Sequence, residues 1–120
     1  MLRRILEVDP AFAVRLKSEL ERMFHDLIAG SDIPMYEPNA EVRGYEVDAY
    51  WPDAELVIEL DSRSFHTSPF AAERDDTKTV ELRLAGLEVH RLTYTMVDRR
   101  PGWVVDTVRT LRARAIAANA

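Results

Sequence analysis

Residues 44–66, GYEVDAYWPDAELVIELDSRSFH, decide the fold of this chain. Proline and polar residues at 52–55 predict a tight turn between two strands that are rich in β-branched and aromatic residues. A four-residue turn places Asp48 opposite Glu59, and strand alternation then brings four carboxylates to one face of the hairpin. The four carboxylates belong to Glu46, Asp48, Glu59 and Asp61. The opposite face of the second strand carries leucine and isoleucine, which require a hydrophobic core.

Carboxylates that face each other across a hairpin repel, because directly opposed Cβ atoms lie about 5 Å apart. A divalent cation would relieve that repulsion, since hard cations prefer several carboxylate and water oxygens. We therefore expect Asp48, Glu59 and Asp61 to bind Mg²⁺ or Mn²⁺. The alternative is that this face is simply acidic and solvated. His66 follows shortly after the strand and is a candidate general acid or base beside the carboxylates.

A long helix is predicted before the hairpin. Asp9 and Pro10 suit its N-terminus, because aspartate accepts hydrogen bonds from free N–H groups and proline fits the first turn. Ser18 and Glu21 have the spacing of a capping box and offer a later start. Apolar residues then recur at helical spacing up to Gly30, where the helix is expected to end.

The remaining elements surround the hairpin. Residues 35–66 are predicted to be extended, with a short first strand and a bend at residues 43–44. A second helix over about 69–85, a strand over 87–94 and a last helix from Pro101 follow. The order is α-β-β-β-α-β-α. Helices on both faces of a central mixed sheet give an α/β fold of three layers, α/β/α.

The composition is that of one globular domain. The chain has 120 residues, of which 47% are hydrophobic and 31% are charged, and these values are ordinary for a folded protein. There is no cysteine, which excludes disulfides and thiolate metal sites. No apolar run approaches the roughly 20 residues needed to span a bilayer, and a cytoplasmic location is expected.

Charge is distributed unevenly along the chain. The net charge of −5 argues against a simple nucleic-acid binder. Residues 1–73 hold 7 basic against 15 acidic residues, a net of −8, whereas residues 74–120 hold 9 against 6, a net of +3. This pattern fits a metal site beside a phosphate-facing surface, or else an uneven solvated surface. Arg63, Arg74 and Lys78 are candidates for contacting a DNA backbone.

Several segments match a known family in order and spacing. They are SELERMF at 18–24, the hairpin segment at 44–66, FAAERD at 70–75 and LAGLEVHRLTY at 84–94. Together they resemble a bacterial domain related to very-short-patch-repair endonucleases, within the PD-(D/E)XK superfamily. The resemblance covers about residues 16–112. It implies a restriction-endonuclease-like fold and a metal-dependent endonuclease that acts on DNA.

The resemblance also assigns roles by position. Asp48 resembles the motif aspartate, and Glu59 resembles the acidic residue of (D/E)XK. Glu21 resembles the first-helix acid that reaches this site, and His66 matches a histidine of the relatives. Asp61 stands where the superfamily has its lysine, a substitution that is usual in this subgroup.

Other departures favour different interpretations. Ser62 stands where relatives have glycine, and Asp76 and Thr79 stand where they have arginine and aspartate. These changes favour a non-catalytic nuclease-fold module that binds DNA or a protein partner. A third interpretation is a dimerisation unit built on the last helix, and a homodimer is also expected of an enzyme that cuts both strands. The resemblance also implies an additional N-terminal DNA-binding domain, which relatives often carry and which we expect to lie outside this chain.

Overall fold

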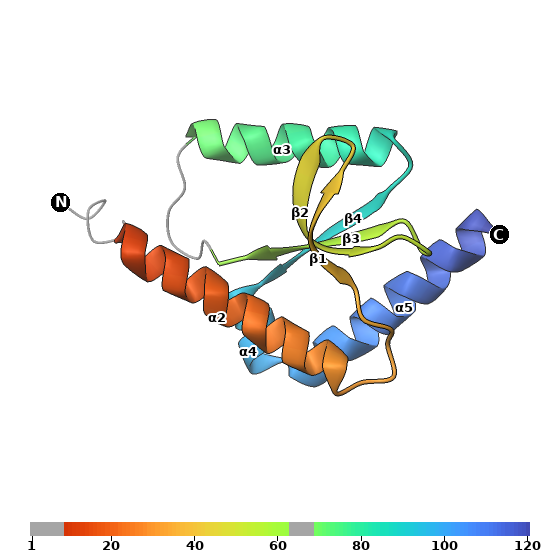
Figure 1. The fold of residues 1–120 in the computed structure, drawn as a ribbon, viewed down its shortest axis with the longest axis horizontal. Coiled ribbons are helices and arrows are strands. Elements are labelled where there is room, and N and C mark those ends of the chain that lie inside the picture. Colours follow the sequence, from red (N-terminus) through yellow and green to blue (C-terminus); the bar gives the residue numbers. More distant parts are fainter. Residues whose placement is uncertain (1–8, 63–68) are drawn as a thin grey trace.

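The computed structural model describes residues 9–62 and 69–120, with side chains for all of these except residues 69–72. Helices cover both faces of a four-stranded sheet (Figure 1). Strands β1 and β2 pair antiparallel, as do β2 and β3, whereas β3 and β4 run parallel. The predicted mixed sheet is therefore confirmed. The strands, in their order across the sheet, are β1 (Glu37–Val42), β2 (Tyr45–Trp51), β3 (Leu56–Asp61) and β4 (Glu88–Thr93).

The helices form the outer layers of the predicted α/β/α arrangement. Helix α3 (Pro69–Leu84) covers one face of the sheet (Figure 1). Helices α2 (Pro10–Ala29), α4 (Tyr94–Arg99) and α5 (Pro101–Asn119) cover the other. The predicted order α-β-β-β-α-β-α is confirmed, with the short α4 added between β4 and α5. Within the described residues, no helix is both long and apolar enough to cross a membrane.

Helix α2 begins where its capping residue predicts. The Asp9 carboxylate accepts a hydrogen bond of 2.9 Å from the Ala11 N–H, and Pro10 occupies the first turn. The helix runs without a break through Ser18, so the later start is wrong. It ends at Gly30, whose N–H donates to the Asp26 carbonyl at 3.0 Å. Its fully buried residues recur at every fourth position and are Leu20, Phe24 and Ile28.

Two tight turns set the register of the first three strands. Arg43 and Gly44 have φ angles of 53° and 84°, the left-handed pair of a type I′ hairpin turn, whose twist matches that of the flanking strands. The predicted turn at 52–55 joins β2 to β3. Across it Ala49 pairs with Ile58, which is the predicted register. Asp48 and Glu59 are the next residues along the two strands.

The apolar residues form one core on each side of the sheet. The larger core lies toward α2, α4 and α5, and the Trp51 indole within it donates to the Pro34 carbonyl at 2.7 Å. The predicted apolar face of β3 belongs to this core: Leu56, Ile58 and Leu60. The smaller core lies toward α3 and contains Val42, Val47, Val57, Leu82, Leu87 and Val89.

The end of the chain differs from the expectation in two ways. The last predicted strand stops at Thr93, whose hydroxyl accepts from the Met96 N–H at 3.2 Å and so begins α4. Six residues are too few to show a helical period, which explains why this helix was not predicted. On α5, Arg109 and Arg112 bind acidic residues of the same chain, Asp32 and Asp53. Two arginines of the expected dimer surface are therefore engaged within the chain.

Candidate active site

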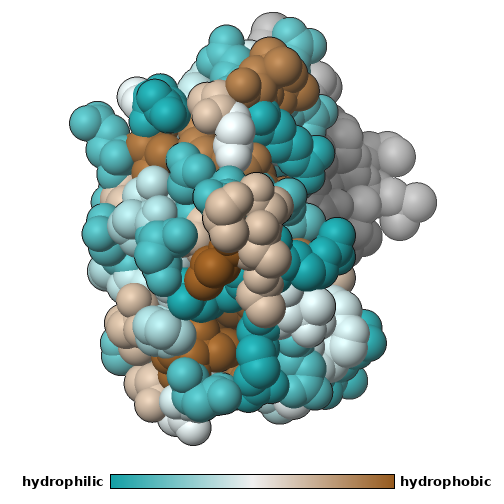
Figure 2. All heavy atoms as spheres, turned by 90° about the vertical axis from the view of Figure 1, so that its right-hand side faces the viewer, coloured by the Kyte–Doolittle hydropathy of each residue, from teal (hydrophilic) through white to brown (hydrophobic). Residues whose placement is uncertain are grey.

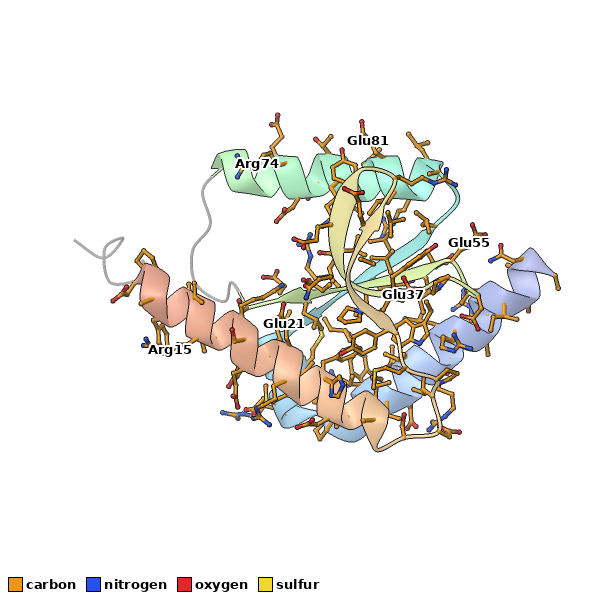
Figure 3. All side chains as sticks on the ribbon, in the orientation of Figure 1. Arg15, Glu21, Glu37, Glu55, Arg74 and Glu81 are labelled. Atoms are coloured by element: carbon orange, nitrogen blue, oxygen red, sulfur yellow. The ribbon has the colours of Figure 1, made fainter. Side chains whose placement is uncertain are left out.

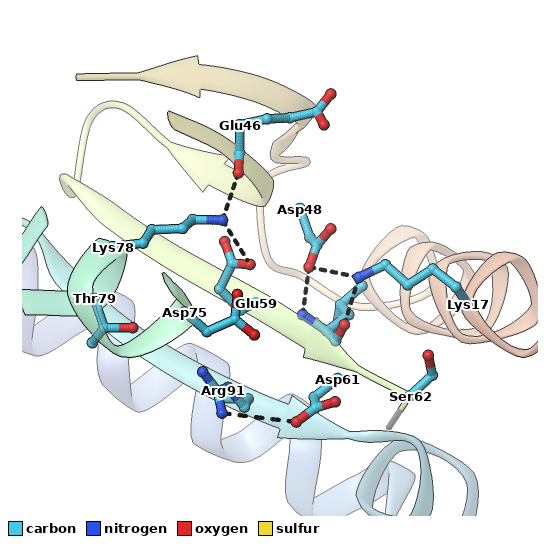
Figure 4. Close-up of a pocket in the computed structure, with 11 residues that line it drawn as sticks. Lys17, Glu46, Asp48, Glu59, Asp61, Ser62, Asp75, Lys78, Thr79 and Arg91 are labelled. Atoms are coloured by element: carbon cyan, nitrogen blue, oxygen red, sulfur yellow. Dashed lines mark hydrogen bonds and ion pairs between the residues drawn. The ribbon is translucent and has the colours of Figure 1, made fainter. Parts of the chain in front are cut away.

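Side chains from both helical layers meet the sheet at a pocket of about 420 Å³ (Figure 4). Asp48 of β2 and Glu59 of β3 both line it, so the predicted pair of carboxylates does converge. Lys17 of α2 and Lys78 of α3 enter from opposite faces of the sheet. Each lysine pairs with one of the two carboxylates.

Asp48 is held by the neighbouring strand. Its Oδ2 accepts from the Leu60 N–H at 2.7 Å, so this carboxylate replaces a backbone acceptor just beyond the Ala49–Ile58 pair. The Lys17 ammonium donates to the same Oδ2 at 2.9 Å and to the Leu60 carbonyl at 2.6 Å. Among the described residues, every hydrogen bond of the Asp48 side chain ends on Oδ2.

Glu59 is the more perturbed of the two carboxylates. Its Oε2 lies 3.2 Å from the Lys78 ammonium, while its Oε1 is buried and has no hydrogen-bond partner among the described residues. Burial, and then the charge of Asp48, raise the pKa of Glu59, and Lys78 opposes that change. A buried acceptor without a hydrogen-bond partner destabilises the fold. Glu59 Oε1 is therefore available to accept a hydrogen bond or to bind a cation.

The Lys78 side chain is more buried than we expect of a residue that contacts the DNA backbone from the protein surface. Its ammonium also donates to the Glu46 carbonyl at 2.6 Å. The expectation for Glu46 is wrong, because its carboxylate points away from the pocket and only its backbone faces Lys78 (Figure 4). The physical reason is that β2 pairs with β3 only from Ala49 to Trp51, whereas it pairs with β1 as far back as Tyr45. The register of the hairpin therefore does not fix where the Glu46 side chain lies relative to β3 and the pocket.

Other predicted residues are distributed differently. Asp61 lines the pocket, and its carboxylate lies 3.8 Å from the Arg91 guanidinium. Glu21 lies on the sheet-facing side of α2 (Figure 3) but is not among the residues that line the pocket. Lys17, one turn earlier on α2, is the side chain that reaches Asp48. The expected reach of Glu21 into the site is therefore displaced by one helical turn.

Glu21 instead acts on a buried tyrosine. Burial, followed by the charges of Glu21, Asp26 and Asp48, raises the pKa of Tyr36 to about 12. Arg74 is exposed near the N-terminal end of α3 (Figure 3), outside the pocket.

Two predicted residues, Arg63 and His66, lie outside the described residues. Sequence reasoning missed Lys17, Asp75 and Arg91, all of which line the pocket. Asp75 had a signal, because residues 75, 78 and 79 share one helix face at spacings of three and four. Arg91 had none, because its position beside Glu59 depends on the parallel register of β3 and β4.

The oxygens present suit a hard divalent cation. Carboxylates and backbone carbonyls are the ligands that Mg²⁺ and Mn²⁺ prefer, and the buried Glu59 Oε1 lacks any other partner among the described residues. Those residues contain no group of three acidic, histidine or cysteine side chains ready to hold a metal. A metal would therefore be held by Asp48 and Glu59, with backbone oxygen and water completing its ligands.

Comparisons with known proteins bear on the fold. No protein-family model matches the chain, and no curated protein matches it. Among solved structures, the catalytic domain of the homing endonuclease I-Bth0305I is similar, with a TM-score of 0.68 and 21% sequence identity. The likeness covers 80% of this chain and 95% of that domain. The fold is therefore restriction-endonuclease-like, as the sequence resemblance implies.

Proposed function

We propose that this chain is a Mg²⁺- or Mn²⁺-dependent endonuclease that hydrolyses phosphodiester bonds in DNA. The observation that carries the proposal is the convergence of Asp48 and Glu59 in one pocket, on the fold of an endonuclease catalytic domain. The sequence resemblance to very-short-patch-repair endonucleases supports the same substrate class.

The chemistry suits the groups present. Hydrolysis of a phosphodiester needs a nucleophilic water and relief of negative charge on the phosphate, and a metal held by Asp48 and Glu59 would supply both. Lys78 is fixed by Glu59 and by the Glu46 carbonyl. An ammonium has three donors, so Lys78 keeps one N–H for a phosphate oxygen. In this way it would replace the motif lysine whose position is taken by Asp61.

The other predicted residues complete the proposal. His66 would move a proton, and Asp61 would assist the metal beside Arg91. Arg63 and the exposed Arg74 would bind the DNA backbone, since arginine forms paired hydrogen bonds to phosphate.

A second candidate function is a non-catalytic nuclease-fold module that binds DNA or a protein partner. The observation that favours it is the pairing of each carboxylate with a lysine, Asp48 with Lys17 and Glu59 with Lys78. The two lysines balance the charges of Asp48 and Glu59, so the repulsion between these two carboxylates does not require a metal. The net charge of −5 favours a protein partner over DNA within this interpretation.

Nicking of supercoiled plasmid distinguishes the two functions. With Mn²⁺ or Mg²⁺ the wild-type protein should relax the plasmid, and EDTA should stop the reaction. Asp48→Ala and Glu59→Gln should abolish cleavage, whereas Glu41→Ala, which removes an exposed carboxylate of β1, should cleave like wild type. Binding of DNA in Ca²⁺ should survive Asp48→Ala and should weaken in Arg74→Ala, with a smaller dependence on salt.

The outcomes separate the alternatives. Cleavage that persists in Asp48→Ala would show that the activity does not belong to this pocket. Salt-dependent DNA binding without cleavage under any divalent metal would leave the non-catalytic module. Absence of both, in folded protein, would leave the protein-partner interpretation.

A further inference from the structure

We propose that the Lys17 ammonium stands in for the divalent cation, so that metal binding must displace it from between Asp48 and Leu60. The proposal rests on the metal-dependent function proposed above. Beyond that function, it identifies Lys17 as the side chain that has to move before a metal can bind.

The geometry around Lys17 is that of a small cation site. Its Nζ lies 2.9 Å from Asp48 Oδ2 and 2.6 Å from the Leu60 carbonyl oxygen, on neighbouring strands (Figure 4). The Leu60 N–H holds the same Asp48 oxygen at 2.7 Å, so the carboxylate is fixed by the sheet itself. The two oxygens converge on one point, and an ammonium occupies it. Hard cations require the same kind of surroundings.

The two lysines of the pocket differ in how firmly they are held. The Lys17 side chain is 35% exposed and reaches the sheet from α2 on a flexible stem, whereas the Lys78 side chain is 20% exposed. Lys78 is also anchored by the Glu46 carbonyl at 2.6 Å, outside the Asp48–Leu60 niche. It occupies only Oε2 of Glu59 and leaves Oε1 without a partner. Lys17 can therefore swing into solvent while Lys78 stays.

This arrangement has a consequence for affinity. A metal that enters has to break two hydrogen bonds of Lys17, so the contacts that stabilise the metal-free pocket weaken metal binding. Removing the ammonium should tighten Mn²⁺ binding by about tenfold, which corresponds to about 1.4 kcal/mol. Loss of any nearby positive charge would also strengthen binding, so the experiment needs a variant that removes a charge without opening the niche.

Calorimetric titration with Mn²⁺ of wild type, Lys17→Met and Arg91→Gln supplies that comparison. Arg91 lines the same pocket, but its guanidinium lies near Asp61 at 3.8 Å rather than in the niche. Lys17→Met should bind Mn²⁺ about tenfold more tightly than wild type, and Arg91→Gln should change affinity much less. Equal tightening in both variants, or none in Lys17→Met, would overturn the inference and leave the metal-dependent function intact. Failure of both wild type and Lys17→Met to bind Mn²⁺ would overturn the two together.

Amine labelling tests the displacement in the wild-type protein. Lys17 and Lys78 are the two lysines of the chain, so mass spectrometry after a short pulse of an acetylating reagent resolves each. Saturating Mn²⁺ should accelerate acetylation of Lys17 severalfold and leave that of Lys78 unchanged. Acetylation of Lys17 that is unchanged or slowed by saturating Mn²⁺ would show that the metal binds without moving it.

Discussion

Replacing Lys78 with methionine should destabilise the fold, because Glu59 would keep a charge without its partner. The Lys78 and Glu59 side chains are 20% and 19% exposed and lie 3.2 Å apart. Exposed ion pairs contribute about 0.2–1 kcal/mol, whereas breaking a fully buried pair costs about 3–5 kcal/mol. This pair lies between those limits. We expect Lys78→Met to lower the free energy of unfolding by about 2 kcal/mol at pH 7.

The penalty should depend on pH in a defined direction. Burial and Asp48 raise the pKa of Glu59, and Lys78 lowers it, so the pKa in Lys78→Met lies higher still. A carboxyl group whose pKa is raised in the folded state stabilises the fold below its unfolded pKa of about 4.3. That contribution is lost as the pH rises through the folded-state pKa. The cost of Lys78→Met should therefore be largest at neutral pH and should shrink as Glu59 takes up its proton.

Urea unfolding of a double-mutant cycle measures this dependence. Wild type, Lys78→Met, Glu59→Gln and the double variant should give a coupling of about 2 kcal/mol at pH 7, and a smaller one near pH 4.5. Arg22→Met is a matched control, because it removes a cation from exposed ion pairs with Glu19 and Asp26, in which the Arg22 side chain is 60% exposed. Its cost should be about 0.5 kcal/mol or less. A coupling near zero, or a penalty for Lys78→Met that is equal at both pH values, would refute the reasoning.

Three further substitutions test the frame around the pocket by urea unfolding. Gly44→Ala should lower the free energy of unfolding by about 1 kcal/mol, because φ is 84° and a Cβ there meets no atom within 4 Å, so that only backbone strain is added. Gly44→Asn should cost less, because asparagine tolerates this conformation better, and equal costs for the two variants would contradict this reasoning. Trp51→Phe should cost about 1–2 kcal/mol by leaving the Pro34 carbonyl without its 2.7 Å donor; a neutral result would show that water replaces it. Arg112→Ala should cost about 1 kcal/mol, since its side chain is 12% exposed and binds both Asp53 oxygens at 2.9 and 3.1 Å; the same loss in an Asp53→Ala background would contradict that pairing.

The hairpin could be predicted because its determinants are local. A four-residue turn at 52–55 fixes the register, and alternation then places Asp48 beside Glu59 without reference to the rest of the chain. The structure has that register, with Ala49 opposite Ile58. Prediction failed for Glu46, two residues further along the same strand. There β2 pairs with β1 but no longer with β3, so the register of the hairpin does not fix where the Glu46 carboxylate lies.

The helical contributions to the site could not be predicted in the same way. Whether Lys17 or Glu21 reaches Asp48 depends on how α2 lies along the sheet, and the two residues differ by only one turn. The contact between Lys17 and Asp48 spans 31 residues, and that between Lys78 and Glu59 spans 19. Contacts between residues so far apart in the sequence are set by the packing of the two cores. The same packing directs the Lys78 side chain inward rather than toward solvent.

The face shown in Figure 2 carries no broad apolar patch among the described residues that would favour a binding module. On the side that carries the C-terminal ends of α3 and α5, hydrophobic side chains form separate patches among hydrophilic ones (Figure 2). A large protein interface is usually marked by a contiguous apolar patch. The face shown in Figure 2 therefore does not add support for a protein partner. The pocket that holds Asp48 and Glu59 is the feature on which the proposed function rests.

The two lysines change what the carboxylates imply. From the sequence alone, Asp48 and Glu59 form a repelling pair, and a metal is the simplest means of relieving the repulsion. In the structure, Lys17 and Lys78 already relieve it. Repulsion therefore no longer requires a metal, and metal binding becomes an exchange of one cation for another. What still calls for a cation is Glu59 Oε1, buried and without a partner among the described residues, on the side of the carboxylate that neither lysine occupies.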